Sequence, residues 1–458
     1  MSPKRSLALL LGLCLLLQAC TKPPRVPKCF ADQPAGPAAT SMVPSETTPR
    51  DPTLPYVPGQ LLVRYQNTGS GLSTNATAGY ALTAQAVRQS HSLTVLRSGN
   101  ENAPDLIAVA DVEQAAAELQ RDPRVAYAHP NYYLEPLLTP NDPYFNQQWN
   151  MSDFGLPEAW EAETGENADG QNVVLAVIDS GVDTDHEDFV GKMLPGCDVF
   201  DQDNDPNPGP PTPGDTAEHG THVAGIAAAV GDNARGVAGV AFGPNVRILP
   251  IKVFDDTGTE GSTDDLIRAI LWAAGIRQST IEDNPNPADI INMSVGAGTT
   301  SIPAVDDAAN QAFNRGVVLF ASAGNNGVTG VQSPANAPDV IAVGSVNSSR
   351  QRSAFSATGP ELDLMAPGGI GPASCGSVPS TFPNSTYACL QGTSMASPFA
   401  AGVAALLLGQ DPTLTPTEIK TRLTSTALFD AGFMTENEYG SGIVCADTAL
   451  GLGTQCGN

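Results

Sequence analysis

The sequence predicts an α/β fold with a mostly parallel sheet covered by helices on both faces, preceded by a small α+β domain. From about residue 141 onward, short apolar runs typical of buried strands alternate with helical stretches. The 45 glycines and 39 prolines indicate many turns, which favours an α/β protein over a helical bundle. Apolar residues make up 41% of the chain, enough for a sizeable buried core.

The N-terminus resembles an export signal followed by a linker. A basic start (MSPKR) precedes an apolar run at residues 7–17, which is too short to span a bilayer. The sequence LQAC, ending at Cys20, resembles a bacterial lipobox in which that cysteine is lipidated, and ordinary signal cleavage is the alternative. We therefore predict a lipoprotein-type signal peptide at residues 1–20 and a proline-rich linker at 21–55.

A small α+β domain is predicted between residues 56 and 137. Residues 112–120, rich in Ala, Glu and Gln, predict a helix with Asp111 as its N-cap. The predicted strands of this domain span residues 60–65, 106–109 and 125–134.

The larger predicted domain spans residues 141–458. Its expected strands lie at residues 173–178, 246–253, 290–294, 317–322 and 340–343. Its expected helices lie at residues 221–230, 264–275, 305–315 and 394–408, with Ser262 or Thr263 capping the second. Parallel sheets place their sites at the carboxyl ends of strands, and Asp179, Ser294 and Asn325 all follow predicted strands.

The net charge excludes one class of partner. The chain has 48 acidic and 22 basic residues. Residues 141–458 hold 38 of the acids and 11 of the bases, a net charge of −27. Because such a domain is repelled by phosphate backbones, we expect no nucleic-acid binding.

Three short segments carry residues suited to nucleophilic catalysis: VIDSGVD at 177–183, HGTHVAG at 219–225 and GTSMASP at 392–398. A serine becomes a strong nucleophile when a histidine accepts its proton, and a carboxylate holds that histidine in the correct tautomer. Asp179, His219 and Ser394 supply these groups, and Gly220 leaves room for close backbone approach. Ser394 opens a predicted helix, whose free N–H groups favour an oxyanion.

With these motifs in the order Asp, His, Ser, the chain resembles the subtilisin-type serine endopeptidases from about residue 141 to 450. The resemblance implies a subtilisin-like fold and hydrolysis of protein and peptide substrates with broad specificity, without a catalytic cofactor. We expect a monomer. Two alternatives stay open: a catalytically silent surface lipoprotein that binds peptides, and a processing protease dedicated to one partner.

The resemblance also implies an oxyanion hole and substrate-binding segments. Asn325, within ASAGNNG, matches the family's oxyanion-hole asparagine. An extended peptide would add as a strand between two edges, residues 294–296 and 257–261, and a primary pocket would be lined by residues 321–324 and 333–336. We expect this pocket to accept apolar or aromatic residues. The predicted substrate-binding residues are Ser294, Val295, Gly296, Gly258, Gly261 and Gly324.

Other polar residues have weaker interpretations. His222 is predicted to pack structurally and His186 to be solvated. An acidic cluster follows the 246–253 strand and either favours basic substrate residues or, as we expect, forms a solvated, helix-capping face. This cluster comprises Asp255, Asp256, Glu260, Asp264 and Asp265.

The resemblance implies structural calcium. The candidate ligands, all in oxygen-rich loops, are Asp142, Asp188, Asp232 and Asn233. The acidic run at residues 201–205 (DQDND) lacks the ligand pattern, and we predict a solvated loop there.

Residues 56–137 resemble the family's inhibitory propeptide, which implies an autoprocessed zymogen. We expect the chain to cut itself within residues 132–140, so that a membrane-anchored precursor releases an extracellular enzyme.

In an oxidising compartment the near neighbours Cys375 and Cys389, and Cys445 and Cys456, are candidate disulfides. Cys197 is then an odd, buried thiol, and the fate of Cys29 is open.

Overall fold

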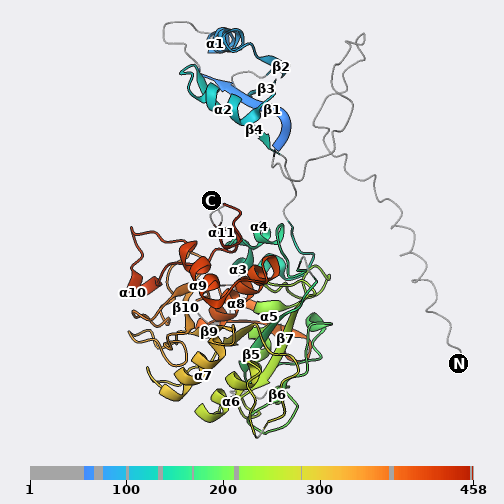
Figure 1. Ribbon diagram of the computed structural model, residues 1–458, viewed down its shortest axis with the longest axis vertical. Coiled ribbons are helices and arrows are strands. Elements are labelled where there is room, and N and C mark those ends of the chain that lie inside the picture. Colours follow the sequence, from blue (N-terminus) through green and yellow to red (C-terminus); the bar gives the residue numbers. More distant parts are fainter. Residues whose placement is uncertain are drawn as a thin grey trace, which may run out of the picture. The chain divides into compact units, whose positions relative to one another are not determined.

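The computed structural model describes residues 56–66, 76–98, 103–132, 138–167, 170–210, 216–279, 281–370, 376–453 and 456. The chain divides into two compact units between Glu135 and Pro136 (Figure 1). The predicted signal peptide and linker, with Cys20 and Cys29, lie outside the described residues. Among the helices that the structure describes, none combines the length and apolar character needed to cross a membrane.

The first unit is a four-stranded antiparallel sheet with two helices. Its strand order is β2-β3-β1-β4, and Asp111 caps helix α2 by accepting a hydrogen bond from Gln114 N, as predicted. Helix α1 was not predicted, because its Ala- and Thr-rich sequence carries only a faint apolar stripe. The elements are β1 (Tyr56–Tyr65), α1 (Ala76–Ser90), β2 (Thr94–Arg97), β3 (Asp105–Ala108), α2 (Val112–Gln120) and β4 (Val125–Tyr132).

The second unit contains the predicted parallel sheet, with strand order β11-β10-β9-β8-β5-β7-β6. The chain starts the sheet in its interior at β5, which pairs with β7 on one side and β8 on the other. The strand order therefore reverses at β5, and a crevice forms at the carboxyl ends of strands at such a point. The strands are β5 (Val173–Asp179), β6 (Cys197–Asp198), β7 (Val246–Lys252), β8 (Ile290–Met293), β9 (Val318–Ser322), β10 (Val340–Val346) and β11 (Leu364–Pro367).

Helices cover both faces of this sheet, as predicted (Figure 1). Helices α5 and α8 pack against each other and against the sheet, and α6 and α7 form a second pair. Ser262 caps α6 in a capping box with Asp265. The main helices are α5 (His219–Ala228), α6 (Thr263–Ala273), α7 (Pro303–Phe313), α8 (Thr393–Gln410) and α9 (Pro416–Ser425). Shorter helices are α3 (Trp149–Ser152), α4 (Leu156–Trp160), α10 (Glu436–Tyr439) and α11 (Ala446–Ala449).

A hairpin that the sequence did not predict packs on α5. Its strands, β12 (Val378–Phe382) and β13 (Thr386–Leu390), are antiparallel. Gly225 of α5 lets the hairpin approach, because a Cβ there would lie 2.1 Å from Oγ1 of Thr381. In the chain, the hairpin directly precedes α8, so it packs on one of these two helices and leads into the other.

Candidate active site

A carboxylate–imidazole pair lies where the strand order reverses. Asp179 is the last residue of β5 and is 1% exposed, and His219 is the first residue of α5. Nδ1 of His219 lies 2.8 Å from Oδ1 of Asp179, so the imidazole donates from Nδ1 and leaves Nε2 able to accept a proton. A Cβ at Gly220 would lie 2.3 Å from the carbonyl oxygen of Gly181, so only glycine permits this approach.

The charge of Asp179 tunes this histidine. Burial lowers the pKa of His219, but the charge and hydrogen bond of Asp179 and the charge of Glu218 outweigh burial and raise it above 6.5. Ser180 N donates to Oδ1 of Asp179 at 2.8 Å, whereas Oδ2 is buried with no hydrogen-bond partner among the described residues. The carboxylate is therefore placed to stabilise a positive charge forming on the imidazole.

Ser394 is buried in the first turn of α8 and is tied to the end of β8. Its hydroxyl donates to the carbonyl oxygen of Ser294 at 3.3 Å, and the Ser294 hydroxyl donates to the carbonyl oxygen of Ser394 at 2.8 Å. Asn292 Nδ2 donates to Oγ of Ser294, and Ser397 Oγ donates to Oδ1 of Asn292. Sequence reasoning missed Asn292 and Ser397, although an asparagine inside an apolar strand run was a signal.

Two hydrogen-bond donors converge beside Gly392. Asn325 accepts with Oδ1 from the backbone N–H of Thr393 at 2.9 Å and from its hydroxyl at 3.0 Å, which leaves Nδ2 to donate. A Cβ at Gly392 would lie 3.4 Å from Nδ2 of Asn325 and 3.5 Å from the backbone N of Ser394. Both nitrogens therefore lie within van der Waals distance of one position beside Gly392, where they could donate to the same oxyanion.

Two adjoining pockets lie beside the pair. The first, about 250 Å³, reaches from Asp179 and His219 to Phe254, and the second, about 330 Å³, shares Phe254, Val295 and Gly296 with it. Phe254 was missed, although an aromatic residue directly after a strand run was visible in the sequence. Of the predicted substrate-binding residues, Ser294, Val295, Gly296 and Gly258 line the first pocket, and Gly261 lines the second.

Gly324 lines neither of these two pockets, and a Cβ there would lie 3.0 Å from Cδ of Gln332.

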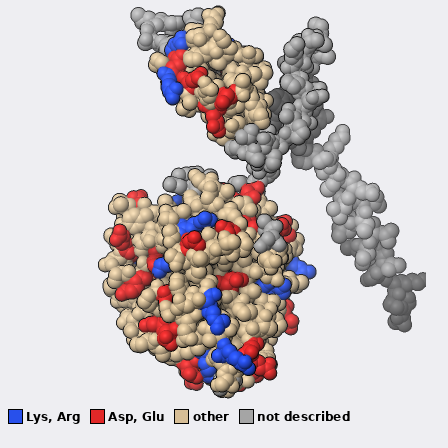
Figure 2. Space-filling view, viewed as in Figure 1, with Lys and Arg blue, Asp and Glu red and all other residues tan. Residues whose placement is uncertain are grey.

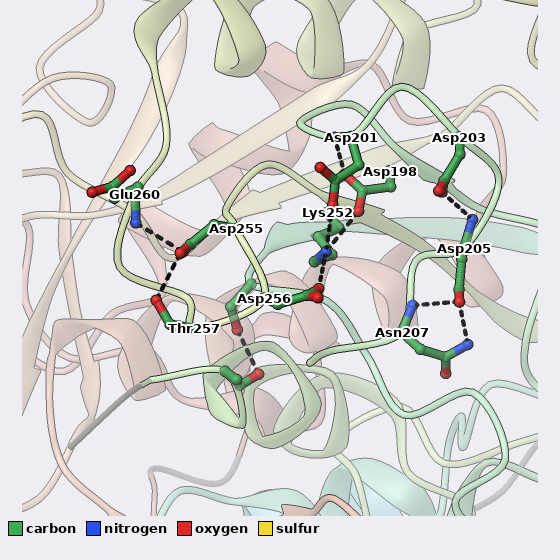
Figure 3. A network of polar contacts seen from close by, with 12 residues as sticks. Asp198, Asp201, Asp203, Asp205, Asn207, Lys252, Asp255, Asp256, Thr257 and Glu260 are labelled. Carbon is green, nitrogen blue, oxygen red and sulfur yellow. Dashed lines mark hydrogen bonds and ion pairs between the residues drawn. The ribbon is translucent and has the colours of Figure 1, made fainter. Parts of the chain in front are cut away.

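The acidic residues near these pockets are mostly engaged with neighbours (Figure 3). Asp255 accepts from Thr257 Oγ1 and from the backbone N–H of Thr259 and Glu260. Asp256 pairs with the buried ammonium of Lys252 at 2.9 Å. Asp264 and Asp265 pair with Arg268 at 3.0 and 2.8 Å. These contacts favour the predicted capping face over recognition of basic substrate residues.

Lys252 organises the loop that holds the 201–205 run. Its Nζ lies 2.7 Å from Oδ2 of Asp198 and 3.6 Å from Oδ2 of Asp201 (Figure 3). Burial lowers the pKa of Lys252, but its hydrogen bonds to Asp198 and Asp256 outweigh burial and raise it. Asp203 and Asp205 accept from backbone N–H groups two residues onward, as in Asx turns. The ammonium thus neutralises carboxylates at the ends of β6 and β7.

The predicted calcium ligands lie in one cluster of loops. Asp142 and Asp188 are buried. Asp142 accepts from the backbone N–H of Asp232 at 2.7 Å, and Asp188 accepts from Asn233 Nδ2 at 3.1 Å. Burial, with the charge of Asp188, raises the pKa of Asp142. Asp232 contacts this cluster through its backbone N–H, and its own carboxylate accepts from Asn141 N at 3.2 Å. Two buried carboxylates close enough to repel each other fit a divalent cation.

The two other histidines of this unit are both buried. His222 donates from Nε2 toward the carbonyl oxygens of Val378 and Ala388 at 3.1 and 3.2 Å, in keeping with its predicted structural role. Its Nδ1 has no hydrogen-bond partner among the described residues, and burial lowers its pKa to about 3. The prediction that His186 is solvated is wrong. His186 is 1% exposed, because the hairpin covers it and the carbonyl oxygen of Thr386 lies 3.0 Å from its Nε2.

The cysteines of this unit comprise a disulfide-bonded pair, one buried thiol, and a predicted pair of which the structure describes only one member. Cys445 and Cys456 form a disulfide with a Cα–Cα distance of 5.5 Å. Cys197 is buried in β6, and burial, with the charge of Asp198, raises its pKa to about 12. Cys389 lies in β13, but Cys375 lies outside the described residues, so their pairing stays a prediction.

Comparisons with known proteins fit this geometry. Residues 170–442 match the subtilase family (Peptidase_S8), and residues 43–131 match the fervidolysin N-terminal prodomain. The chain is 40% identical to the thermophilic serine proteinase of Bacillus sp. strain AK1, over 67% of this chain and 69% of that protein. It is 38% identical to subtilisin E of Bacillus subtilis strain 168, over 74% and 78% respectively.

A solved structure of a protease from Pseudoalteromonas arctica PAMC 21717 has a TM-score of 0.62 and 36% identity, covering 69% of this chain and all of that one. The epidermin leader peptide processing serine protease of Staphylococcus aureus, 21% identical with a TM-score of 0.57 over 87% of this chain and 99% of that one, shares the fold. The chain therefore belongs to the subtilase family of serine endopeptidases, with a fervidolysin-like prodomain ahead of its catalytic unit.

Proposed function

We propose that this subtilase hydrolyses peptide bonds through Asp179, His219 and Ser394, with Asn325 and the Ser394 backbone N–H as the oxyanion donors. The observation that carries this proposal is the convergence of Asn325 Nδ2 and Ser394 N on one space beside Gly392. Donors placed in advance where negative charge develops stabilise the transition state without reorganising.

Each proton has a place in this scheme. The Ser394 hydroxyl turns from Ser294 O toward His219, whose Nε2 takes the proton as Oγ attacks the scissile carbonyl carbon. The carbonyl oxygen becomes an oxyanion and accepts from Asn325 and Ser394 N–H. His219 then gives the proton to the leaving amine, and a water molecule repeats the sequence to release the acid. Asp179 holds the imidazole and stabilises its charge throughout.

The substrate is proposed to be an extended peptide lying between residues 294–296 and residues 258–261. Main-chain hydrogen bonds along such edges recognise any sequence, which favours broad specificity. A phosphonate probe should label Ser394, and Ser394→Ala should abolish both labelling and casein hydrolysis. A catalytically silent peptide-binding protein would give no labelling. A dedicated processing protease would be labelled but would leave casein intact.

We also propose that the chain is an autoprocessed zymogen cut between Tyr132 and Leu138. Tyr132 ends the last strand of the first unit, whereas Leu138 packs on the core of the catalytic unit and its N–H donates to Glu161. N-terminal sequencing of the released enzyme tests this. The Ser394→Ala protein should stay uncut, and a released enzyme that begins after Tyr144 would contradict the scheme.

Structural calcium is proposed at Asp142, Asp188 and Asn233. The cation would relieve the repulsion between the two buried carboxylates and stabilise the loops without entering the reaction. Calcium should raise the unfolding temperature of the Ser394→Ala protein relative to EDTA, and Asp188→Asn should abolish that increase. An equal unfolding temperature in both buffers would contradict the site.

Export remains part of the proposal. The basic start, the apolar run at residues 7–17 and Cys20 support a lipid-anchored precursor and an extracellular mature enzyme. A relative from Xanthomonas campestris, 35% identical over 74% of this chain and 62% of that protein, is named an extracellular protease. Mass spectrometry of the membrane fraction should find a lipidated Cys20, and Cys20→Ala should release the uncut Ser394→Ala precursor from the membrane.

A further inference from the structure

A glutamine side chain lies between two glycines that flank the reaction centre. Gly296 follows β8, Gly324 follows β9, and Gln332 lies on the connection from β9 to β10. A Cβ at Gly296 would lie 2.9 Å from Oε1 of Gln332. A Cβ at Gly324 would lie 3.0 Å from Cδ of Gln332 and 3.1 Å from its Oε1. The Gln332 amide therefore occupies the slot that side chains at positions 296 and 324 would enter, between the two glycine backbones.

The slot opens beside the reacting atoms. Gly324 directly precedes Asn325, the proposed oxyanion donor, and its N–H donates to Thr393 Oγ1 at 3.2 Å. Gly296 lies two residues after Ser294, whose carbonyl oxygen accepts from the Ser394 hydroxyl. Because residues 321–324 and 333–336 are the expected lining of the primary pocket, this slot is the expected place for the side chain of the residue before the cleaved bond.

The Gln332 backbone is held firmly. Gln332 N donates to the carbonyl oxygen of Ala323 at 3.1 Å, and Asn336 N donates to that of Gln332 at 3.2 Å. The next residue, Ser333, pairs with the segment that follows Gly296: its N–H donates to Thr299 O at 2.8 Å, and its carbonyl oxygen accepts from Ala297 N at 2.9 Å. Only rotation of the side chain would therefore empty the slot.

We propose that Gln332 is a specificity-determining residue that restricts the residue before the cleaved bond to small side chains, such as those of Gly, Ala and Ser. This inference rests on the proposed function of the same site. A leucine or phenylalanine side chain could enter only after the half-buried Gln332 side chain rotates out, whereas a small side chain requires no such displacement. This proposal differs from the expectation of apolar or aromatic residues in this pocket, and the two predict opposite Phe/Ala preferences.

Two variants separate filling of the slot from hydrogen bonding by the amide. Gln332→Gly empties the slot, whereas Gln332→Met keeps a side chain of similar length without the amide. Among the described residues the Gln332 side chain forms no hydrogen bond, so methionine leaves no partner unsatisfied. If the amide instead recognised a polar substrate side chain, methionine would abolish the preference.

The experiment measures kcat/KM of the mature enzyme on peptides that differ only at this residue, with Gly, Ala, Ser, Leu or Phe before the cleaved bond. The wild type should favour Ala over Phe by about tenfold or more, and Gln332→Gly should raise the Phe/Ala ratio at least about tenfold. Gln332→Met should keep the wild-type order. A wild type that cleaves Phe at least as well as Ala, or an unchanged ratio in Gln332→Gly, would overturn the proposal.

Titration of Ser394 with a phosphonate probe keeps the two proposals distinguishable. Full labelling with a preference for Phe overturns the specificity inference and leaves the proposed catalytic function in place. An absence of labelling in folded, processed wild type overturns the proposed function and this inference together.

Discussion

Helix α5 carries two histidines three residues apart, and its two sides place them in opposite electrostatic environments. On the cleft side, Nδ1 of His219 lies 2.8 Å from the Asp179 carboxylate, and its pKa is raised. On the hairpin side, His222 faces the carbonyl oxygens of Val378 and Ala388, and burial lowers its pKa to about 3. A negative charge stabilises imidazolium, whereas two neutral acceptors do not compensate for its desolvation.

This difference assigns the two residues different tasks. His219 has a raised pKa and a free Nε2, so it can accept and return a proton. His222 stays neutral and joins α5 to both strands of the hairpin. One helix thus holds a proton carrier toward the cleft and a neutral structural donor toward the interior.

The largest expected effect comes from removing the charge on the cleft side. Asp179→Asn should lower kcat by about ten-thousandfold, the scale known for this aspartate in serine proteases including subtilisin, a relative of this chain. The amide no longer favours the tautomer with a free Nε2. Steady-state kinetics on a chromogenic peptide measure this, with Asp183→Asn as the control. A loss below about tenfold would contradict the assignment.

Removing an oxyanion donor tests the catalytic role of the cleft side without changing any residue of α5. Asn325→Leu should lower kcat by about a hundredfold to a thousandfold with little change in KM, because this hydrogen bond strengthens in the transition state. Asn326→Leu, at the adjacent position, is the matched control. An effect on KM alone would exclude Asn325 as the donor.

On the hairpin side the expected effect is on stability. His222→Leu leaves the buried carbonyl oxygen of Val378 and the half-buried one of Ala388 without this donor, which should lower the free energy of unfolding by about 1–3 kcal/mol. His222→Gln keeps an N–H donor and should lose less. Guanidinium unfolding in the Ser394→Ala background, which prevents autolysis, gives both values. If His222→Leu also lowered kcat as much as Asp179→Asn, the division between the two sides would fail.

The low pKa of His222 predicts how stability depends on pH. The unfolded chain binds a proton near pH 6.5, but the folded chain binds it only near pH 3. The contribution of His222 is therefore fully present above pH 6.5 and is lost as the pH falls toward 3, by up to about 1.4 kcal/mol per pH unit. Comparison of unfolding midpoints for His222→Gln and its parent between pH 6.5 and 4 isolates this slope. Equal slopes would contradict the assignment.

The smallest expected effect is on the acidic side, or acid limb, of the pH profile of kcat/KM. His219 acts as a base only when neutral, and its raised pKa places the fall of kcat/KM with decreasing pH above pH 6.5. Glu218→Gln removes one of the charges that raise this pKa and should move the limb slightly toward lower pH. A limb below pH 6.5 in the wild type would contradict the raised pKa.

Much of the fold followed from local patterns. The apolar runs predicted five of the seven strands of the parallel sheet, missing the short strands β6 and β11, and their alternation with helices predicted its layers. The structure places Asp179 at a strand end and Ser394 in the first turn of a helix, as predicted, and begins α5 at His219, two residues before the predicted start. Whether these residues act as proposed stays a prediction until they are mutated.

Other features depend on segments far apart in the sequence. The hairpin that covers His186 and His222 is made of short, Ser- and Thr-containing strands with little apolar periodicity. The exchange of hydrogen bonds between Ser294 and Ser394 joins residues 100 positions apart. No local pattern predicts such contacts, because the partners meet only after the sheet and helices have packed.

The sequence by itself determined the alternation of strands and helices, the catalytic motifs and the acidic charge of the larger domain, because composition and periodicity are properties of neighbouring residues. Only the tertiary structure decided which way side chains point across long-range contacts. It placed the Gln332 side chain between Gly296 and Gly324, and it gave His219 and His222 opposite pKa shifts. The physical reason is that burial, a facing carboxylate and a filled slot are all set by neighbours in space, which the order of residues along the chain does not specify.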